Sequence, residues 1–245
     1  MILYDKSSVR IAELHFDANE APPDADVVRY QWQCEPVPGT HTVTNHTISL
    51  DLTQDPETLL KRMRKQTRYE IRRAEKESIA VDLDDQPTPD KLVQYYNFYD
   101  LFAERKGIPR ANRARLESMR RTGQLILSRA FDADGQTLVW QCGLRTPTRV
   151  RSLTAASIRH TGDSNLVGRA NRYLRWAEIN HFRKLGIEVY DLGGWYAGDT
   201  DQEKISINLF KEGFGGEISK LYNTYDGRTW KGRMAVRLHR WRKGE

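Results

Sequence analysis

Two hydrophobic periods follow each other in the first third of the chain. Residues 43–52 alternate apolar and polar positions, as a half-buried strand does. The apolar spacing then changes to three and four residues, which predicts one amphipathic helix after Asp55, with Asp55 as N-cap and Pro56 at the first helical position. The buried stripe of this helix is expected to be Leu60, Met63, Thr67, Ile71 and Ala74.

Two more helices and a short strand are predicted before residue 124. A short strand is expected at residues 81–83, and a helix runs from the N-cap Thr88 to Gly107, which ends it. A third, shorter helix covers residues 113–121. Residues 1–52 are expected to form short strands and loops.

The order of elements after residue 124 predicts the sheet. Strands at residues 124–131 and 136–144 flank Asp134 and Gly135, a strong hairpin signal. A strand at 150–158, a long helix at about 166–185 and a strand at 187–192 follow. A helix that crosses between two strands makes them parallel neighbours. We therefore expect an α/β fold (α+β in the stricter classification), with a mixed, mostly antiparallel sheet flanked by helices.

Size and composition set the domain division. The 245 residues, 38% of them hydrophobic, suffice for one large domain, or for one domain with a smaller N-terminal portion. We expect a strand-rich segment at residues 1–52, a main domain at 53–228 and a basic amphipathic helix at 229–245. The first residues carry no basic start followed by an apolar run, which predicts a cytoplasmic protein.

Positive charge is concentrated in two segments. Residues 61–76 hold eight basic and two acidic residues, and residues 229–245 hold six basic and one acidic residue. Two basic segments on a mildly acidic body favour an anionic partner, such as donor phosphates, a nucleotide-linked sugar, tRNA or an acidic membrane surface. In the C-terminal helix, packing of the apolar side is the default, and contact with tRNA or an anionic membrane is the alternative. That apolar side is formed by Trp230, Met234, Leu238 and Trp241.

Three motifs, in consistent order and spacing, resemble the GNAT-like acyltransferases related to Fem-type (FemAB/FemX) peptidoglycan aminoacyltransferases. The first is the strand end Leu50-Asp51-Leu52 with a helix that reads R-x-x-I-R-x-A from Arg68. The second is the helix from Ala170 that leads to Y-D-L-G-G at Tyr190. The third is F-K-x-G-F-G-G from Phe210. The resemblance covers about residues 50–223, and it makes residues 1–52 a remnant of a first GNAT-like domain.

This resemblance implies an acyl transfer site. Donor and amine are positioned together where two strands splay apart, and backbone N–H groups there can hold the donor carbonyl. Asp191 is expected to face the cleft and to bind or deprotonate the acceptor amine; the alternative is that it pairs with an arginine or caps a turn. Lys211 is implied to stabilise the donor ester or the developing oxyanion. Gly193 and Gly194 are expected to allow close approach of the backbone.

Other candidates concern binding. Trp195 and Tyr196 are expected either to line the acceptor pocket or to pack in the core. The turn before the long helix is a candidate donor-phosphate site or an ordinary surface turn, since its glycine spacing is degenerate and Asp163 repels anions. Its candidate residues are Gly162, Gly168 and Arg169. The candidates for gripping substrate phosphates, against a plain solvated face, are Arg68, Arg72 and Arg73.

The resemblance therefore implies a bacterial N-acyl or aminoacyl transferase acting on an amino group of an envelope or polysaccharide-related acceptor. No permanently bound cofactor and no metal are expected; acyl-CoA, an acyl-carrier protein or aminoacyl-tRNA serves as the donor co-substrate. The alternative is a non-catalytic GNAT-like protein that binds nucleic acid or an anionic membrane.

Overall fold

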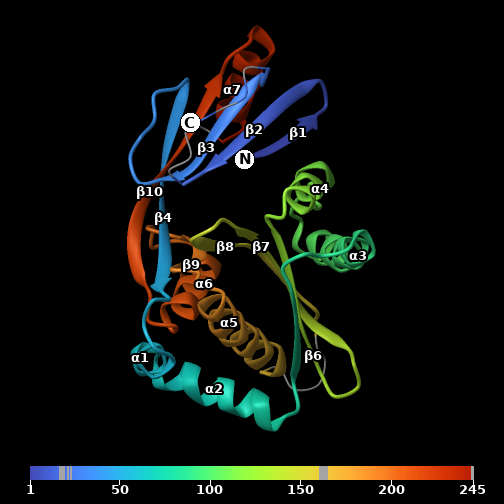
Figure 1. The fold of residues 1–245 in the computed structure, drawn as a ribbon, viewed down its shortest axis with the longest axis vertical. Coiled ribbons are helices and arrows are strands. Elements are labelled where there is room, and N and C mark those ends of the chain that lie inside the picture. Colours follow the sequence, from blue (N-terminus) through green and yellow to red (C-terminus); the bar gives the residue numbers. More distant parts are fainter. Residues whose placement is uncertain (17–19, 21, 23, 160–164, 244–245) are drawn as a thin grey trace. The chain divides into compact units, whose positions relative to one another are not determined.

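The computed structural model describes residues 1–16, 20, 22, 24–159 and 165–243, and the chain divides into two compact units (Figure 1). Unit 1 comprises residues 1–47, 112–122 and 219–245, and unit 2 comprises residues 48–111 and 123–218. Strands β4 (His41–Asp51) and β10 (Glu217–Gly227) pass from one unit into the other. Unit 1 therefore gathers both ends of the chain with an internal helix.

Unit 1 is a small sheet with two helices. Its strands are β1 (Ile2–Lys6), β2 (Val9–His15), β3 (Val27–Gln33) and β10. The β2–β3 pair is parallel, and the β1–β2 and β3–β10 pairs are antiparallel. Helix α4 (Arg113–Arg121) packs on β1, while α7 (Trp230–Lys243) packs on β2 and β3.

Unit 2 holds a mixed sheet of the predicted kind, in the strand order β4-β9-β8-β7-β6-β5. The strands are β5 (Ala80–Asp84), β6 (Leu125–Phe131), β7 (Thr137–Arg145), β8 (Arg149–Ser157) and β9 (Val189–Trp195). Strands β5 to β8 pair antiparallel, and β8 pairs parallel with β9. The predicted hairpin and the predicted parallel crossover are both confirmed.

Helices cover both faces of this sheet. They are α1 (Pro56–Arg62), α2 (Lys65–Lys76), α3 (Pro89–Lys106), α5 (Leu166–Lys184) and α6 (Gln202–Glu212). Trp140 of β7 meets the ring of Tyr95 in α3, and its neighbour Gln141 bonds to Asn171 of α5. Because adjacent residues of a strand point to opposite faces, α3 lies on one face and α5 on the other. Helix α2 packs along α5.

The single helix predicted after Asp55 is wrong in one respect, because it breaks at Met63. Asp55 does cap α1, accepting from the backbone N–H of Thr58 at 2.9 Å. Met63 is extended (ψ 145°) and buried, and the N–H of Arg64 donates to the carbonyl of Gly213 at 2.9 Å. Tertiary contacts therefore override the local period.

No helix in the described part of the chain has both the length and the apolar character needed to cross a bilayer.

Candidate active site

Strands β8 and β9 pair over only three residues each before they diverge. Arg149–Arg151 lie in register with Val189–Asp191, whereas β8 continues to Ser157 and β9 to Trp195. The two strands therefore form a notch that opens beyond Arg151 and Asp191. This is the splayed parallel pair that the resemblance implies.

A β-bulge in β8 accounts for the divergence. Cys142 of β7 pairs with Thr154, but the next residue, Gly143, pairs with Ser152, so Leu153 is an extra residue. A bulge bends its strand and re-aims the side chains around it. Accordingly, Ser152 bonds to α5 on one face of the sheet, while the Thr154 hydroxyl meets Tyr95 of α3 at 2.7 Å on the other.

A cavity of about 540 Å³ lies at this notch. A volume in this range suits a small-molecule site. Four segments contribute its lining: the bulged part of β8, the end of β9, one ridge of α5 and one side of α6. The lining residues are Ser152, Leu153, Thr154, Ala155, Asn171, Arg175, Leu192, Gly193, Gly194, Glu203, Ser206, Ile207, Phe210 and Lys211.

Lys211 places a cation in this cavity. Its Nζ donates to the backbone carbonyl of Gly194 at 2.5 Å. Burial, and then the charges of Arg175 and Arg151, lower the pKa of Lys211 to about 8, although Asp191 partly opposes this. Lys211 therefore remains mostly protonated at neutral pH, yet holds its proton less tightly than an exposed lysine.

Arg175 fixes one wall of the cavity. Its guanidinium donates to the Tyr190 hydroxyl at 2.5 Å, to the Ser152 hydroxyl at 2.8 Å and to Glu178 at 3.3 Å. Glu178 also accepts from Tyr190 and from Ser128. Arg175, Glu178 and Tyr190 are all buried, so the network is rigid and keeps a positive charge beside Lys211.

Gly193 brings the backbone of β9 close to that of β8 in the notch. Its φ is +87°, and a Cβ built there would lie 3.0 Å from the carbonyl oxygen of Ser152. Glycine is the residue that meets both conditions without strain. Gly193 and Gly194 both line the cavity, as expected.

Asp191 is not among the lining residues, in contrast to the expected cleft-facing acid. It is 1% exposed and forms an ion pair with the buried Arg151. Its other carboxylate oxygen accepts from the N–H of Gly193 at 2.7 Å. The structure thus corresponds to the alternative given above, a carboxylate that pairs with an arginine and caps a turn.

The two aromatic candidates also lie outside the cavity lining. Trp195 packs against the core of unit 2 and donates from Nε1 to Glu212 at 3.0 Å. Tyr196 is held through its backbone by Asn208 and carries the ammonium of Lys204 over its ring at 4.9 Å. Both residues consolidate the turn between β9 and α6.

The arginines of α2 lie elsewhere in unit 2. Arg68 and Arg72 line a separate hollow of about 410 Å³ that shares no lining residue with the notch cavity. Arg68 also donates to the carbonyls of Leu60, Lys61 and Met63, which satisfies the end of α1. Arg73 pairs with Glu77 on the surface at 2.7 Å.

Of the donor-phosphate candidates, Gly162 lies outside the described residues. The carbonyl of Gly168 accepts from Arg172 at 3.2 Å. Arg169 is 7% exposed and pairs with Glu77 of the α2 end at 2.6 Å. Its charge therefore joins α5 to α2 in this structure.

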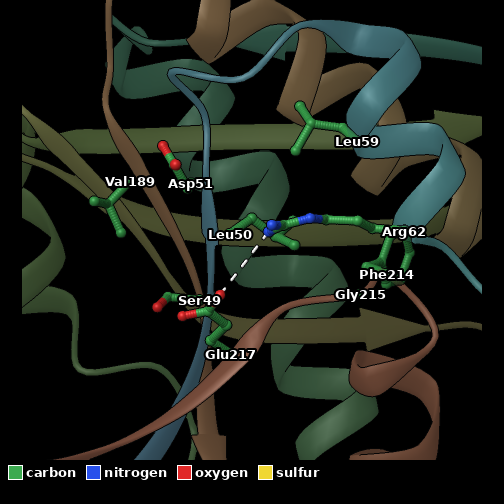
Figure 2. A pocket seen from close by; sticks show the side chains of 9 residues that line it. All are labelled: Ser49, Leu50, Asp51, Leu59, Arg62, Val189, Phe214, Gly215 and Glu217. Atoms are coloured by element: carbon green, nitrogen blue, oxygen red, sulfur yellow. Dashed lines mark ion pairs between the residues drawn. The ribbon is translucent and has the colours of Figure 1, made fainter.

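A further hollow, of about 100 Å³, lies between β4, α1 and the segment after α6. Figure 2 shows Arg62 reaching across it toward Glu217, with an ion-pair distance of 3.9 Å. Binding pockets usually measure roughly 300–1,000 Å³, so this hollow is too small for an activated donor. The notch cavity is the better candidate site.

Several polar lining residues escaped the sequence reasoning. Asn171 and Arg175 lie four apart on α5, a spacing that places both on one ridge and could have identified them. Ser152 and Glu203 had no such signal, because only the bulge and the packing of α6 bring them to the cavity.

Comparison with known proteins supports the fold. No family model and no curated protein matches the sequence. The structure of FemX is similar, with a TM-score of 0.59 and 13% identity, over 79% of this chain and 63% of FemX. This chain thus spans less than two thirds of the length of FemX.

Two further structures are similar at comparable levels. The C-terminal domain (DUF2156) of a protein described as a lysylphosphatidylglycerol synthetase, from Agrobacterium fabrum, has a TM-score of 0.56 and 12% identity, over 86% of this chain and 71% of that domain. L-PGS from Bacillus licheniformis has a TM-score of 0.54 and 12% identity, over 81% and 66%. At these identities the likeness establishes the fold, and the structural resemblance to Fem-type proteins is confirmed.

Proposed function

We propose that this chain transfers an acyl or aminoacyl group from an activated donor to an amino group of an envelope or polysaccharide-related acceptor. The observation that carries the proposal is the cavity at the β8–β9 notch, which Gly193 and Gly194 line and where Lys211 contacts the backbone of Gly194. The fold shared with FemX and with the lysylphosphatidylglycerol synthetase domains supports the same reaction class.

The reaction needs little beyond positioning and charge. The acceptor nitrogen attacks the donor carbonyl carbon, a C–N bond forms, and the C–S or C–O bond to the leaving group breaks. The amine loses one proton and the leaving thiolate or alkoxide gains one. Lys211 Nζ, displaced from Gly194, donates to the carbonyl oxygen as its negative charge develops.

The walls of the cavity suit the two substrates. The positive charges of Arg175 and Lys211 favour the anionic transition state over the neutral carbonyl. Glu203, which lines the cavity and pairs with Lys106 at 2.7 Å, offers a carboxylate to an acceptor that arrives as an ammonium ion. Asp191 serves in this proposal as a positioning residue, because its charge is paired with Arg151.

The donor is taken to be acyl-CoA, an acyl-carrier protein or aminoacyl-tRNA. The basic residues of α2 suit the phosphates of any of these donors. No permanently bound cofactor is needed, because the donor carries the activated carbonyl.

A transfer assay with matched variants tests the proposal. Labelled acetyl-CoA, a long-chain acyl-CoA, an acylated carrier protein and aminoacyl-tRNA are each offered with a panel of acceptors that carry an amino group: amino sugars, peptides and aminolipids. One donor is expected to yield an N-acyl product, and Lys211→Met is expected to abolish most of that product. Lys204→Met removes an exposed lysine of the same helix outside the cavity and is the control. Equal product from wild type and Lys211→Met, or product with no donor, refutes the assignment.

A further inference from the structure

The C-terminal helix α7 packs on unit 1 through one narrow face. Val236 is 2% exposed, and the ring of His239 lies 4.9 Å from that of Tyr225. A Cβ at Gly232 would lie 1.9 Å from the carbonyl oxygen of Asp26, so the helix touches the backbone there. These three residues therefore lie on the side of α7 that faces unit 1, where the helix packs on β2 and β3. Figure 1 shows α7 beside these strands.

The opposite face of α7 is apolar and exposed. The sequence suggested that the large apolar residues of this helix pack by default; the structure places them outward instead. Their exposed fractions are 65% for Trp230, 62% for Met234, 47% for Leu238 and 78% for Trp241. At about 100° per residue these four positions fall within an arc of about 80°, so they form one continuous stripe. We call these four residues the α7 stripe.

Basic residues border the stripe on both sides. With the same angle of about 100° per residue, Arg233 and Arg237 fall along one edge of the stripe and Lys231 along the other. All three side chains are exposed. The helix contains no acidic residue. Long basic side chains beside an apolar stripe can keep their charges among lipid phosphates while their stems follow the apolar surface.

This pattern selects among the partners that α7 could bind. The phosphates of RNA could pair with the basic side chains of α7, and nucleobases could stack on its tryptophans. Met234 and Leu238, however, offer no aromatic ring for such stacking. A second copy of this helix would bring like charges together. An anionic bilayer suits the tryptophans, the aliphatic residues and the basic residues together. Tryptophan favours the membrane interface, Met and Leu enter the boundary of the acyl chains, and the basic side chains contact the lipid phosphates.

We propose that α7 docks this protein on the surface of an anionic lipid bilayer, with the α7 stripe inserted at the headgroup boundary. The helix lies in the plane of the interface, because its inner face remains on β2 and β3. The inference is independent of the transfer reaction, since it rests on the exposed surface of unit 1 and needs neither donor nor acceptor.

Sedimentation with vesicles tests the docking. The full chain is mixed with vesicles of equimolar phosphatidylglycerol and phosphatidylcholine, or of phosphatidylcholine alone. Binding to the anionic vesicles is expected to be at least about tenfold tighter and to weaken with salt. The tryptophan emission is expected to shift to the blue in the presence of anionic vesicles.

Two double variants separate the contributions of the stripe and the bases. Trp230→Ser with Trp241→Ser is expected to lower the affinity for anionic vesicles by about tenfold or more and to remove the blue shift. Arg233→Gln with Arg237→Gln is expected to lower the affinity by about tenfold or more and to reduce the salt dependence. All four side chains are exposed, so circular dichroism and the Tm should match the wild type.

Matched controls account for lost apolar area and lost charge. Tyr69→Ser with Leu101→Ser removes two large side chains of unit 2 with exposures of 55% and 66%, against 65% and 78% for Trp230 and Trp241. Lys65→Gln with Lys76→Gln removes two exposed bases from α2. Both controls are expected to bind vesicles within about twofold of wild type. The proposal would be overturned by equal binding to neutral and anionic vesicles, or by a stripe variant that binds as the wild type does. It would also be overturned by preferential binding of tRNA over vesicles, or by a wild-type dimer that becomes a monomer in the stripe variant.

Discussion

Replacing Lys211 by methionine tests the reaction and the electrostatics of the notch together. The change removes the ammonium that contacts Gly194 while keeping most of the apolar stem. With a pKa of about 8, Lys211 is about nine-tenths protonated at pH 7, so the wild type offers a donor to the oxyanion in most molecules. Loss of one such donor lowers kcat by about 10²–10³ in other acyl-transfer sites, and we expect a fall of this order.

The free energy of unfolding of Lys211→Met should rise or stay unchanged, although its kcat falls. The folded-state pKa of Lys211 lies below its ordinary value of 10.5, so folding favours the neutral amine. The charged form therefore destabilises the fold at pH values below about 8, and wild-type stability should rise as the pH increases from about 8 to 10. Lys211→Met should be at least as stable as wild type at pH 7 and should lack that rise.

The measurement is kcat/KM against pH for wild type, Lys211→Met, Lys211→Arg and Lys204→Met. The wild type should lose activity on the alkaline side with a midpoint near pH 8, where Lys211 deprotonates. Arginine stays charged, so that limb should move above about pH 10 in Lys211→Arg. An unchanged alkaline limb in Lys211→Arg, or a fall in activity matched by a fall in Tm in Lys211→Met, would show that Lys211 acts structurally.

Gly193→Ala should lower kcat/KM by about tenfold or more, because a Cβ there meets the Ser152 carbonyl; Gly186→Ala carries the same positive-φ strain with no atom within 4 Å and should cost about 1 kcal/mol of stability without loss of activity. Glu13→Gln should lose about 3 kcal/mol of unfolding free energy at pH 7, since Glu13 is buried with Arg115 at 2.7 Å and Arg29 at 3.3 Å. Burial raises the pKa of Glu13, but Arg115 and the other neighbours outweigh this, so the net pKa lies below its ordinary value. The wild type should therefore lose this stability as the pH falls below about 5, and the variant should not. Urea unfolding between pH 7 and pH 3 measures the difference. Asp191→Asn should destabilise the protein by about 3–5 kcal/mol in the same urea assay at pH 7, because it removes the negative charge that pairs with the buried Arg151.

Local signals in the sequence predicted most of the elements of unit 2. The cap at Thr88 accepts from the N–H of Lys91, and Gly107 ends α3 with a φ of +64°. These features act within a few residues, so they are legible without the fold. The break at Met63 is not, because the carbonyl of Gly213 that replaces the helical bond comes from a distant part of the chain.

The candidate site divides in the same way. Gly193, Gly194 and Lys211 were found through motifs, and the structure brings them to one cavity. The bulge at Leu153 has no glycine in its own strand, and its effect on Ser152 depends on pairing with β7. The buried network around Arg175 is likewise a matter of contacts between α5 and the sheet, which apolar periodicity does not encode.

Asp191 shows how a motif residue can matter without touching the substrate. It is paired in register with Arg151 at the last position before β8 and β9 diverge, and their side chains form a buried ion pair at that vertex. If the pair positions the notch, removing both charges in Arg151→Met with Asp191→Asn should recover most of the stability that Asp191→Asn loses, because no buried charge remains unpaired. Transfer activity should recover in parallel, at all pH values tested. If Asp191 is instead the base that deprotonates the acceptor, the double variant will be stable and inactive. Urea unfolding and kcat/KM measured on the wild type, Asp191→Asn, Arg151→Met and the double variant therefore distinguish a carboxylate that holds the strands from one that takes the proton.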